Sequence, residues 1–355
     1  MSKTAIMKSE LFLEHDPGFS HVESPDRLTA IYSGLAEYEA MSGFAFPEPE
    51  PAEHRHLQLV HTADHVRRIA ETAGQGFVSL DPDTGASSRS FEAAALAAGS
   101  VIKGARMVMA GEVDNAFALV RPPGHHAEAD RPMGFCLFNN VAVAAAYALD
   151  ELGLERVMIV DWDLHHGNGT QQSFYDTEQV LYFSTHMYPY YPGSGDLHEL
   201  GSGSGEGYTV NVPLSGGVND QAYAAIFNEV LAPSARQYKP EMIRVSAGYD
   251  IYAGDPLGTM AVTAAGFAYM TRVLKGLAEE LCDGRLILTL EGGYNLEGLR
   301  EGVLASLGEL AGESLLPDIV EQVDGLADAA FGNTGSLSAE ALEMLRRAYA
   351  KRWQI

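Results

Sequence analysis

Short apolar runs alternate with longer helical segments through most of the chain, and this alternation predicts its architecture. The apolar runs lack polar alternation, which is typical of buried parallel strands. They lie at residues 116–120, 157–160, 180–184, 208–212, 242–246 and 286–290. The helical segments lie at residues 91–110, 141–152, 220–238, 263–281 and 296–310. Strands that alternate with helices favour an α/β fold in which a mostly parallel central sheet carries helices on both faces.

The ends of the chain show weaker patterns. Residues 1–60 predict an irregular segment with short helices, and residues 74–90 predict a loop rich in turn-forming residues. The chain shows neither an internal repeat nor an early break in composition, so residues 1–312 are expected to form one domain. Residues 313–355 are expected to form a connector and an amphipathic helix that packs on that domain.

Composition and charge narrow the function classes. The chain has 355 residues and a formal net charge of -25 without a cluster of Lys or Arg, which argues against nucleic-acid binding. This acidity favours cationic substrates through long-range attraction. The two cysteines, Cys136 and Cys282, exclude a disulfide scaffold and favour a reducing compartment, so a cytoplasmic location is expected. We find neither a signal peptide nor the roughly 20 apolar residues of a membrane span, so no membrane association is expected.

The most informative stretch is residues 157–169, where an apolar run leads directly into Asp, His and Asn side chains. In open α/β sheets, ligand sites lie outside the carboxyl ends of the strands. Asp163 and His165 are two positions apart, so in an extended conformation they project to the same side and can bind a divalent metal ion. Asp161 lies on that side too, as a further ligand or as an anchor for one. A single Asp or His here would more often be a helix cap or a solvated turn residue, but several together indicate a metal or catalytic site.

Polar clusters also follow other predicted strands. The run at 116–120 leads to His125 and His126, a pair suited to general acid–base catalysis. Asp250 follows another run and is a candidate third metal ligand, and Tyr294 follows the last run with a hydroxyl donor. Because the carboxyl ends of parallel strands meet at one edge of a sheet, we expect these clusters to converge there.

This combination of side chains predicts a reaction type. Two Asp and one His leave a coordination position of a metal ion open, which is usual in catalytic rather than structural sites. Such a metal lowers the pKa of bound water towards about 7 and polarises a carbonyl group. A neutral His then accepts the proton of the water, and a Tyr hydroxyl stabilises the developing oxyanion. The sequence therefore favours hydrolysis of an amide or ester without a covalent intermediate.

Motifs distributed along the chain resemble those of the zinc-dependent histone deacetylase family. They are Arg-Pro-Pro-Gly-His-His from residue 121, Gly-Phe-Cys-Leu-Phe-Asn-Asn from 134, Asp-Trp-Asp-Leu-His-His-Gly-Asn-Gly-Thr-Gln from 161, Tyr-Pro-Gly-Ser-Gly from 191, Gly-Asp-Pro-Leu from 254 and Glu-Gly-Gly-Tyr from 291. The resemblance spans about residues 14–312 and is strongest for class II enzymes and bacterial histone-deacetylase-like amidohydrolases. It implies an arginase/deacetylase-like α/β fold with about eight strands in the central sheet. It also implies removal of acetyl or related acyl groups from the ε-amine of lysine.

The resemblance implies one catalytic zinc ion and assigns its ligands, which are Asp163, His165 and Asp250. His125 and His126 match the tandem active-site histidines, with Asp161 orienting His125 and Asn168 near His126. Since only His125 then has a carboxylate partner, the pKa values of the two histidines should differ. His126 is expected to act mainly as the general base, with His125 providing electrostatic stabilisation and a proton. Tyr294 matches the tyrosine that stabilises the transition state, which predicts a competent enzyme.

The same resemblance assigns a substrate tunnel and monovalent-cation sites. Phe135 and Tyr191 match the aromatic walls of the tunnel, Gly134 lines it, and Leu257 matches its rim. Asp83 matches a rim aspartate that holds the substrate backbone. One or two structural potassium ions are implied, with an inner site of Asp161, Asp163, His165, Ser184 and Thr185 and an outer site of Phe174, Thr177, Val180 and Tyr208.

Alternatives to this function stay open. A binuclear manganese site of arginase type would need a carboxylate at position 252, where the chain has Tyr252, and is disfavoured. An acetylpolyamine amidohydrolase is a nearer alternative, but its relatives carry Glu where Leu257 stands here, and an apolar rim lacks the charge that attracts a second ammonium group. Tyr294 opposes a catalytically silent acyl-lysine-binding protein. The expected partner is an acyl-lysine peptide or protein, or an acylated small amine, while the acyl chain and the formation of a homo-oligomer stay open.

Overall fold

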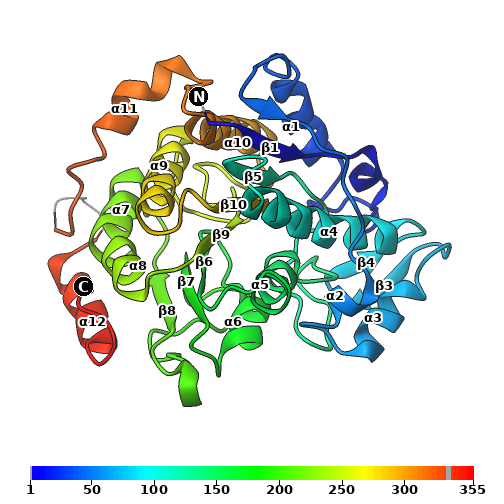
Figure 1. The fold of residues 1–355 in the computed structure, drawn as a ribbon, viewed down its shortest axis with the longest axis horizontal. Coiled ribbons are helices and arrows are strands. Elements are labelled where there is room, and N and C mark those ends of the chain that lie inside the picture. The colour runs from blue at the N-terminus through cyan, green and yellow to red at the C-terminus, as the bar shows by residue number, and fades with distance from the viewer. Residues whose placement is uncertain (1, 333–336) are drawn as a thin grey trace.

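A parallel β-sheet forms the centre of the molecule (Figure 1). The computed structural model describes residues 2–332 and 337–355. The eight-stranded sheet has the order β2-β1-β5-β10-β9-β6-β7-β8, and every neighbouring pair is parallel. The strands are β1 (Thr4–Met7), β2 (Phe44–Ala45), β5 (Asn115–Ala118), β6 (Val157–Asp161), β7 (Val180–Met187), β8 (Thr209–Leu214), β9 (Met242–Ala247) and β10 (Leu286–Leu290). The predicted α/β class and parallel sheet are therefore confirmed.

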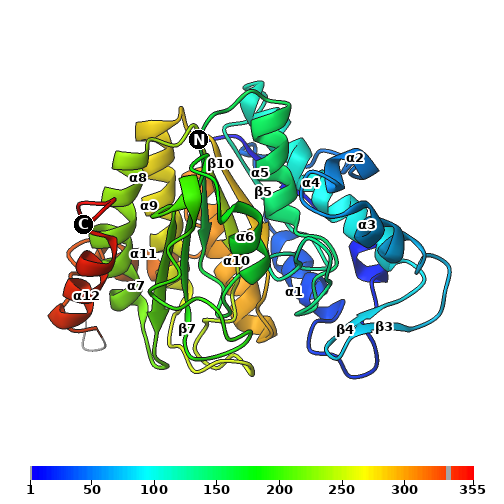
Figure 2. The ribbon, with the colours of Figure 1, turned by 90° about the horizontal axis from the view of Figure 1, so that it is seen from below.

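Helices cover both faces of the sheet (Figure 2). One face lies against α4 (Ser90–Met109) and α5 (Asn140–Asp150), and the other against α9 (Ala264–Leu281) and α10 (Leu296–Ala311). The helix predicted at 220–238 consists of α7 (Asp220–Ile226), a π-helical turn at Phe227–Leu231 and α8 (Ala232–Tyr238). The shorter helices are α1 (Asp26–Leu35), α2 (His54–Leu57), α3 (Ala63–Ala70), α6 (Asn168–Phe174), α11 (Val320–Asp324) and α12 (Ala339–Tyr349). Every residue of β5, β6, β9 and β10 is buried, which explains their lack of polar alternation.

The N-terminal part of the chain is more regular than its pattern predicted. The region 1–60, predicted to be irregular, contributes β1 and β2 to the central sheet. These strands have 4 and 2 residues, which is too short for a detectable period. The region 74–90, predicted to be a loop, contains an antiparallel hairpin of β3 (Val78–Asp81) and β4 (Thr84–Ala86). Both predictions were therefore wrong in part.

The C-terminal residues pack beside β8 at one edge of the sheet (Figure 1). The Tyr349 hydroxyl accepts a hydrogen bond from Asn211 N and donates one to Asn211 O, both at 2.7 Å, and Trp353 Nε1 donates to Gly207 O at 2.7 Å. These bonds engage backbone groups of an edge that would otherwise be open to pairing. Residues 333–336 of the predicted connector lie outside the described residues, and the domain boundary near residue 312 stays a prediction. Within the described part, no helix is both long and apolar enough to span a membrane.

A buried ionic cluster joins loops at the carboxyl edge of the sheet. Glu23 lies between Arg27 and Arg121, and all three side chains are fully buried. Arg121 Nη2 donates to Glu23 Oε2 (2.8 Å), and Arg27 Nη1 donates to Glu23 Oε1 (3.0 Å). Arg27 also donates to the carbonyl oxygens of Glu291 (2.5 Å) and Gly293 (2.7 Å), beyond β10. Burial disfavours the charged carboxylate, but the Arg121 charge and hydrogen bonds hold the pKa of Glu23 well below its usual value.

Replacing Glu23 by Gln should destabilise the fold strongly. The substitution leaves two buried guanidinium groups without a counter-charge, and breaking a buried pair in this way costs about 3–5 kcal/mol. Urea unfolding followed by circular dichroism measures this loss. The control is Glu280→Gln, which breaks the exposed ion pair with Arg236 and should leave the unfolding midpoint nearly unchanged. A wild-type midpoint in the Glu23 variant would contradict the structural role of the cluster.

Candidate active site

Three buried side chains meet beyond the carboxyl ends of β6 and β9. Asp163, His165 and Asp250 each offer a ligand atom, and these atoms lie within 4.8 Å of one another. His165 Nδ1 is 3.3 Å from Asp163 Oδ1 and 3.2 Å from Asp250 Oδ2. Leu164 N donates to Asp250 Oδ1 (2.9 Å) and Gly292 N donates to Asp163 Oδ2 (2.8 Å), so the backbone orients both carboxylates.

The donor set of this cluster fits a divalent cation. Burial, and then the neighbouring Asp163 charge, raises the pKa of Asp250 to about 7. A bound cation would offset this repulsion, and carboxylate oxygens with an imidazole nitrogen are ligands that zinc accepts. Three protein ligands also leave a position for water or substrate. The structure thus brings together the three predicted metal ligands, while the identity of the metal stays a prediction.

Two histidines beside the cluster have different partners. His125 Nδ1 donates to Asp161 Oδ2 (3.0 Å), and the Tyr182 hydroxyl donates to the same oxygen (3.0 Å). Burial disfavours the charged form of His125, but Asp163 and Asp161 outweigh it and raise its pKa to about 10. His126 Nδ1 instead donates to Asn168 Oδ1 (2.8 Å). Burial, and then the His125 charge, holds the pKa of His126 well below its usual value, which is the opposite direction to the pKa shift of His125.

Glu291 fixes the loop that carries the histidines. Its Oε2 accepts from Gly124 N (2.6 Å) and His125 N (3.1 Å), and its Oε1 accepts from the Ser246 hydroxyl (3.0 Å). Burial raises the pKa of Glu291 to about 7. No role was predicted for Glu291 or for Arg27, which contacts the loop after β10. A carboxylate directly after a buried strand was the available signal for Glu291.

A narrow cavity leads to these groups. Its volume is about 110 Å³. It is lined by Asp83, Pro123, His125, His126, Gly134, Phe135, His165, Tyr191, Leu257, Gly292 and Tyr294. The rings of Phe135 and Tyr294 meet edge to face with centroids 6.0 Å apart, and Tyr191 meets His126 in the same way at 5.1 Å. The residues predicted for the tunnel and its rim therefore line one cavity together with both histidines.

The hairpin of β3 and β4 carries one wall of this cavity. Asp83, at its turn, accepts hydrogen bonds on Oδ1 from Gly134 N (3.1 Å) and the Thr84 hydroxyl (2.7 Å). Thr84 Oγ1 in turn accepts from Phe135 N (3.0 Å). Gly134 has a φ of 56°, and a Cβ at this position would collide with the His126 ring. Glycine is therefore needed where the wall passes the histidine.

Tyr294 lines the cavity from the loop after β10. Its backbone N donates to Asp255 Oδ2 (2.7 Å), as does Asn295 N (3.0 Å), so one carboxylate fixes this turn. The Arg27 guanidinium lies 4.9 Å from the centre of the Tyr294 ring. Burial raises the pKa of Tyr294 well above its usual value, so the phenol keeps its proton and can donate a hydrogen bond.

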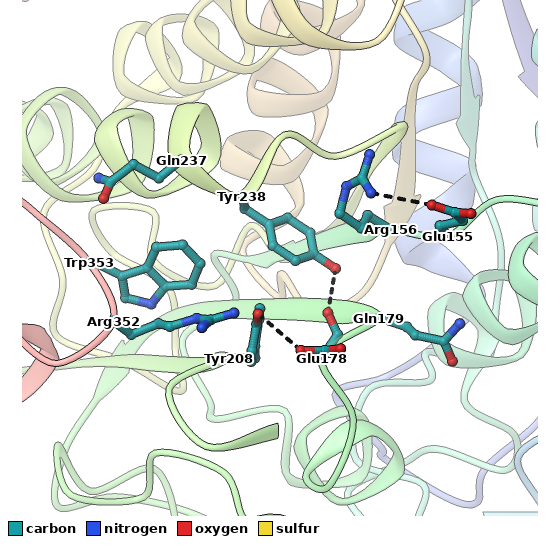
Figure 3. A pocket seen from close by; sticks show the side chains of 9 residues that line it. All are labelled: Glu155, Arg156, Glu178, Gln179, Tyr208, Gln237, Tyr238, Arg352 and Trp353. Atoms are coloured by element: carbon teal, nitrogen blue, oxygen red, sulfur yellow. Dashed lines mark hydrogen bonds and ion pairs between the residues drawn. The ribbon is translucent and has the colours of Figure 1, made fainter. Parts of the chain in front are cut away.

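The residues predicted to bind potassium fall into separate places. Ser184 pairs with Asp161 in the β6–β7 register, and the Thr185 hydroxyl lies 3.5 Å from Asp161 O. Tyr208 lines another cavity, of about 720 Å³, near the amino ends of β6, β7 and β8 (Figure 3). There Arg352 lies over the Tyr208 ring, 4.0 Å from its centre. The metal-ligand cluster lies at the other end of the strands, beyond their carboxyl ends. Potassium binding stays a prediction.

Comparison with known proteins identifies relatives over most of the chain. The histone deacetylase domain matches residues 21–310. A probable deacetylase from Archaeoglobus fulgidus is 41% identical over 297 residues, which cover 83% of this chain and 82% of that protein. Histone deacetylase 15 from Arabidopsis thaliana is 43% identical over 314 residues, which cover 87% of this chain but only 55% of that protein. The crystal structure of the HDA15 HD domain is similar with a TM-score of 0.85 at 39% identity, over 99% of this chain and 98% of that one.

Replacing Gly134 by Ala should destabilise the protein more than the same change at Gly153. Both glycines have a positive φ, 56° and 70°, and this conformation costs an Ala residue about 1–2 kcal/mol. At Gly134 the added Cβ also collides with the His126 ring, whereas at Gly153 it meets nothing within 4 Å. Urea unfolding of both variants separates the collision from the backbone strain. Equal losses of unfolding free energy would show that the cavity wall beside His126 can shift to fit the added methyl group without further loss of stability.

Proposed function

The chain belongs to the histone deacetylase family, and we propose that it is a zinc-dependent amidohydrolase that removes acetyl or related acyl groups from the ε-amine of lysine. The observation that carries this proposal is the cluster of Asp163, His165 and Asp250 beside a cavity that is also lined by His125, His126 and Tyr294. An acid, a base, an oxyanion donor and a cation site thereby reach the same space.

Each side chain has a distinct task in the proposed reaction. The cluster would hold the zinc ion, which when bound polarises the scissile carbonyl and lowers the pKa of a water molecule. His126 is neutral, so it accepts the proton of the attacking water. His125, protonated and paired with Asp161, stabilises negative charge and donates a proton to the departing amine. Tyr294 donates a hydrogen bond to the developing oxyanion.

The shape of the cavity favours a slender aliphatic amine. A cavity of about 110 Å³ whose lining includes the rings of Phe135 and Tyr191 suits the methylene chain of an acyl-lysine. Asp83 brings a carboxylate to the wall, where we propose that it holds the substrate backbone, and Leu257 contributes an apolar group. The net charge of -25 favours peptides rich in basic residues.

Bound potassium ions and a cytoplasmic location are also part of the proposal. Potassium ions are proposed at the inner residues around Asp161 and Ser184 and at the outer residues around Tyr208. Both cysteines, Cys136 and Cys282, are free and buried, and a cytoplasmic location is proposed from this use of cysteine.

A second candidate is an acetylpolyamine amidohydrolase. The net charge of -25 favours it, because a polyamine carries further ammonium groups beside the scissile amide. Leu257 opposes it, since the cavity lining has no carboxylate at that position to bind a second ammonium group. The two candidates use the same catalytic groups and differ only in what binds at the rim.

A hydrolysis panel on the purified chain tests these candidates. We expect faster cleavage of acetyl-lysine or longer acyl-lysine peptides than of acetylated polyamines, with zinc content measured by elemental analysis. A zinc chelator should abolish all cleavage, and added zinc should restore it. Preference for polyamines would assign the second function. Peptide binding without turnover by the zinc-loaded protein would instead indicate an acyl-lysine-binding protein.

Replacing Tyr294 by Phe should lower kcat about 10²–10³-fold, because an oxyanion donor is removed while the ring that lines the cavity stays. Zinc content should be unchanged, since Tyr294 is not part of the ligand cluster. The matched control is Tyr269→Phe, which removes a hydroxyl that donates to Asn228 in the layer of α7 and α9. Turnover of the Tyr294 variant at the wild-type rate would refute its oxyanion role.

A further inference from the structure

Two hydrogen bonds in series connect His126 to Glu128 through Asn168. His126 Nδ1 donates to Asn168 Oδ1 (2.8 Å), and Asn168 Nδ2 donates to Glu128 Oε1 (2.8 Å). His126 and Asn168 are 4% and 8% exposed, whereas Glu128 is half-buried and does not line the cavity. A continuous series of hydrogen bonds therefore connects a partly solvated carboxylate to a histidine of the candidate active site.

The direction of the Asn168 amide decides which nitrogen of His126 carries the proton. A carboxamide has an acceptor at one end and donors at the other, and the two ends are nearly identical in shape. With Oδ1 facing the ring, Nδ1 carries the proton and Nε2 keeps a lone pair. With the amide reversed, Nδ1 would have to accept and the proton would move to Nε2. Only the first tautomer has an Nε2 that can accept a proton.

The groups around Asn168 favour that first direction. An ionised carboxylate accepts hydrogen bonds and cannot donate them, so Glu128 requires the amide nitrogen to face it. Met133 Sδ and the His126 carbonyl oxygen also accept from Asn168 Nδ2, both at 3.4 Å. A charge-assisted hydrogen bond is about twice as strong as a neutral one, so the shorter contact with Glu128 contributes most.

We propose that Glu128 is a positioning residue that sets the tautomer of His126 through the direction of the Asn168 amide. His125 needs no such relay, because its partner Asp161 accepts at either oxygen. The kinetic consequence of this inference rests on the proposed function, in which His126 is the general base. The tautomer itself can be measured without any substrate.

Reversing the polarity at position 128 tests the inference. In Glu128→Lys, a donor-only ammonium group should reverse the Asn168 amide and move the His126 proton to Nε2. For an acyl-lysine peptide, kcat should then fall about 100-fold or more, the contribution of a positioned general base. KM should change by less than about twofold, because residue 128 does not line the cavity. The ¹⁵N spectrum of histidine-labelled protein, assigned with His126→Ala, reports the tautomer.

A rescue variant and a control variant separate the relay from general effects of charge. In Glu128→Lys/Asn168→Asp, a carboxylate at position 168 accepts from both the ammonium group and His126 Nδ1. The original tautomer should return, together with at least about a tenfold recovery of kcat. Asp130→Lys makes the charge reversal on an exposed residue of the same loop and should change neither the tautomer nor kcat.

The outcomes are distinct. An unchanged tautomer in Glu128→Lys, or a loss of kcat that the second substitution does not restore, would overturn the inference. If Glu128→Lys does not fold, Glu128→Met removes the acceptor without adding a donor and should give a mixture of tautomers. A pure Nδ1–H signal in that variant would also overturn it. Absence of turnover in the wild type would contradict the proposed function instead, and the spectra would still decide the role of Glu128.

Discussion

The carboxylate of Glu23 is fully buried, and the catalytic edge of the sheet depends on the two guanidinium groups that neutralise it. Charges taken out of water cost several kcal/mol each, so such a cluster persists only where the remaining donors also find acceptors. Arg121 finds them in carbonyl groups of the N-terminal segment, and Arg27 finds them in the loop after β10. That loop begins with Glu291, whose carboxylate holds the backbone of His125. An ionic cluster near the N-terminus is thus connected by hydrogen bonds to the site.

The partners of His125 and His126 favour different charge states of the two rings. Their ring centres lie only 4.0 Å apart, so two imidazolium groups would repel each other strongly. Asp163 and Asp161 outweigh burial and raise the pKa of His125, whereas burial together with the His125 charge lowers the pKa of His126. In the proposed reaction, this difference would place an acid and a base side by side at neutral pH, as acid–base catalysis of amide hydrolysis needs.

The sequence predicted the parts of the molecule whose signal is local. Apolar runs located β5 to β10, since these strands are buried almost throughout, and the polar residues after them located the metal-ligand cluster. The strands β1 and β2 escaped prediction because so few residues show no period and their pairing depends on distant partners. The ionic cluster of Glu23, Arg27 and Arg121 could not be predicted for a related reason. Glu23 and Arg121 are 98 positions apart and Arg27 and Glu291 are 264 apart, so no local pattern connects them.

The contacts that position the two histidines differ in how deeply they are buried. Asp161 is itself held by the Tyr182 hydroxyl and by Asp163 N, all within the buried interior, so the orientation of His125 follows from the packing of the sheet. In the relay proposed above, the tautomer of His126 follows instead from the carboxylate of Glu128, a half-buried residue. Packing of the buried core is therefore sufficient to orient His125. In the proposed relay, the tautomer of His126 also needs the contact between Asn168 and Glu128. The proposed general base would then depend on one polar contact made at a half-buried residue, where a single change of charge would reverse the tautomer.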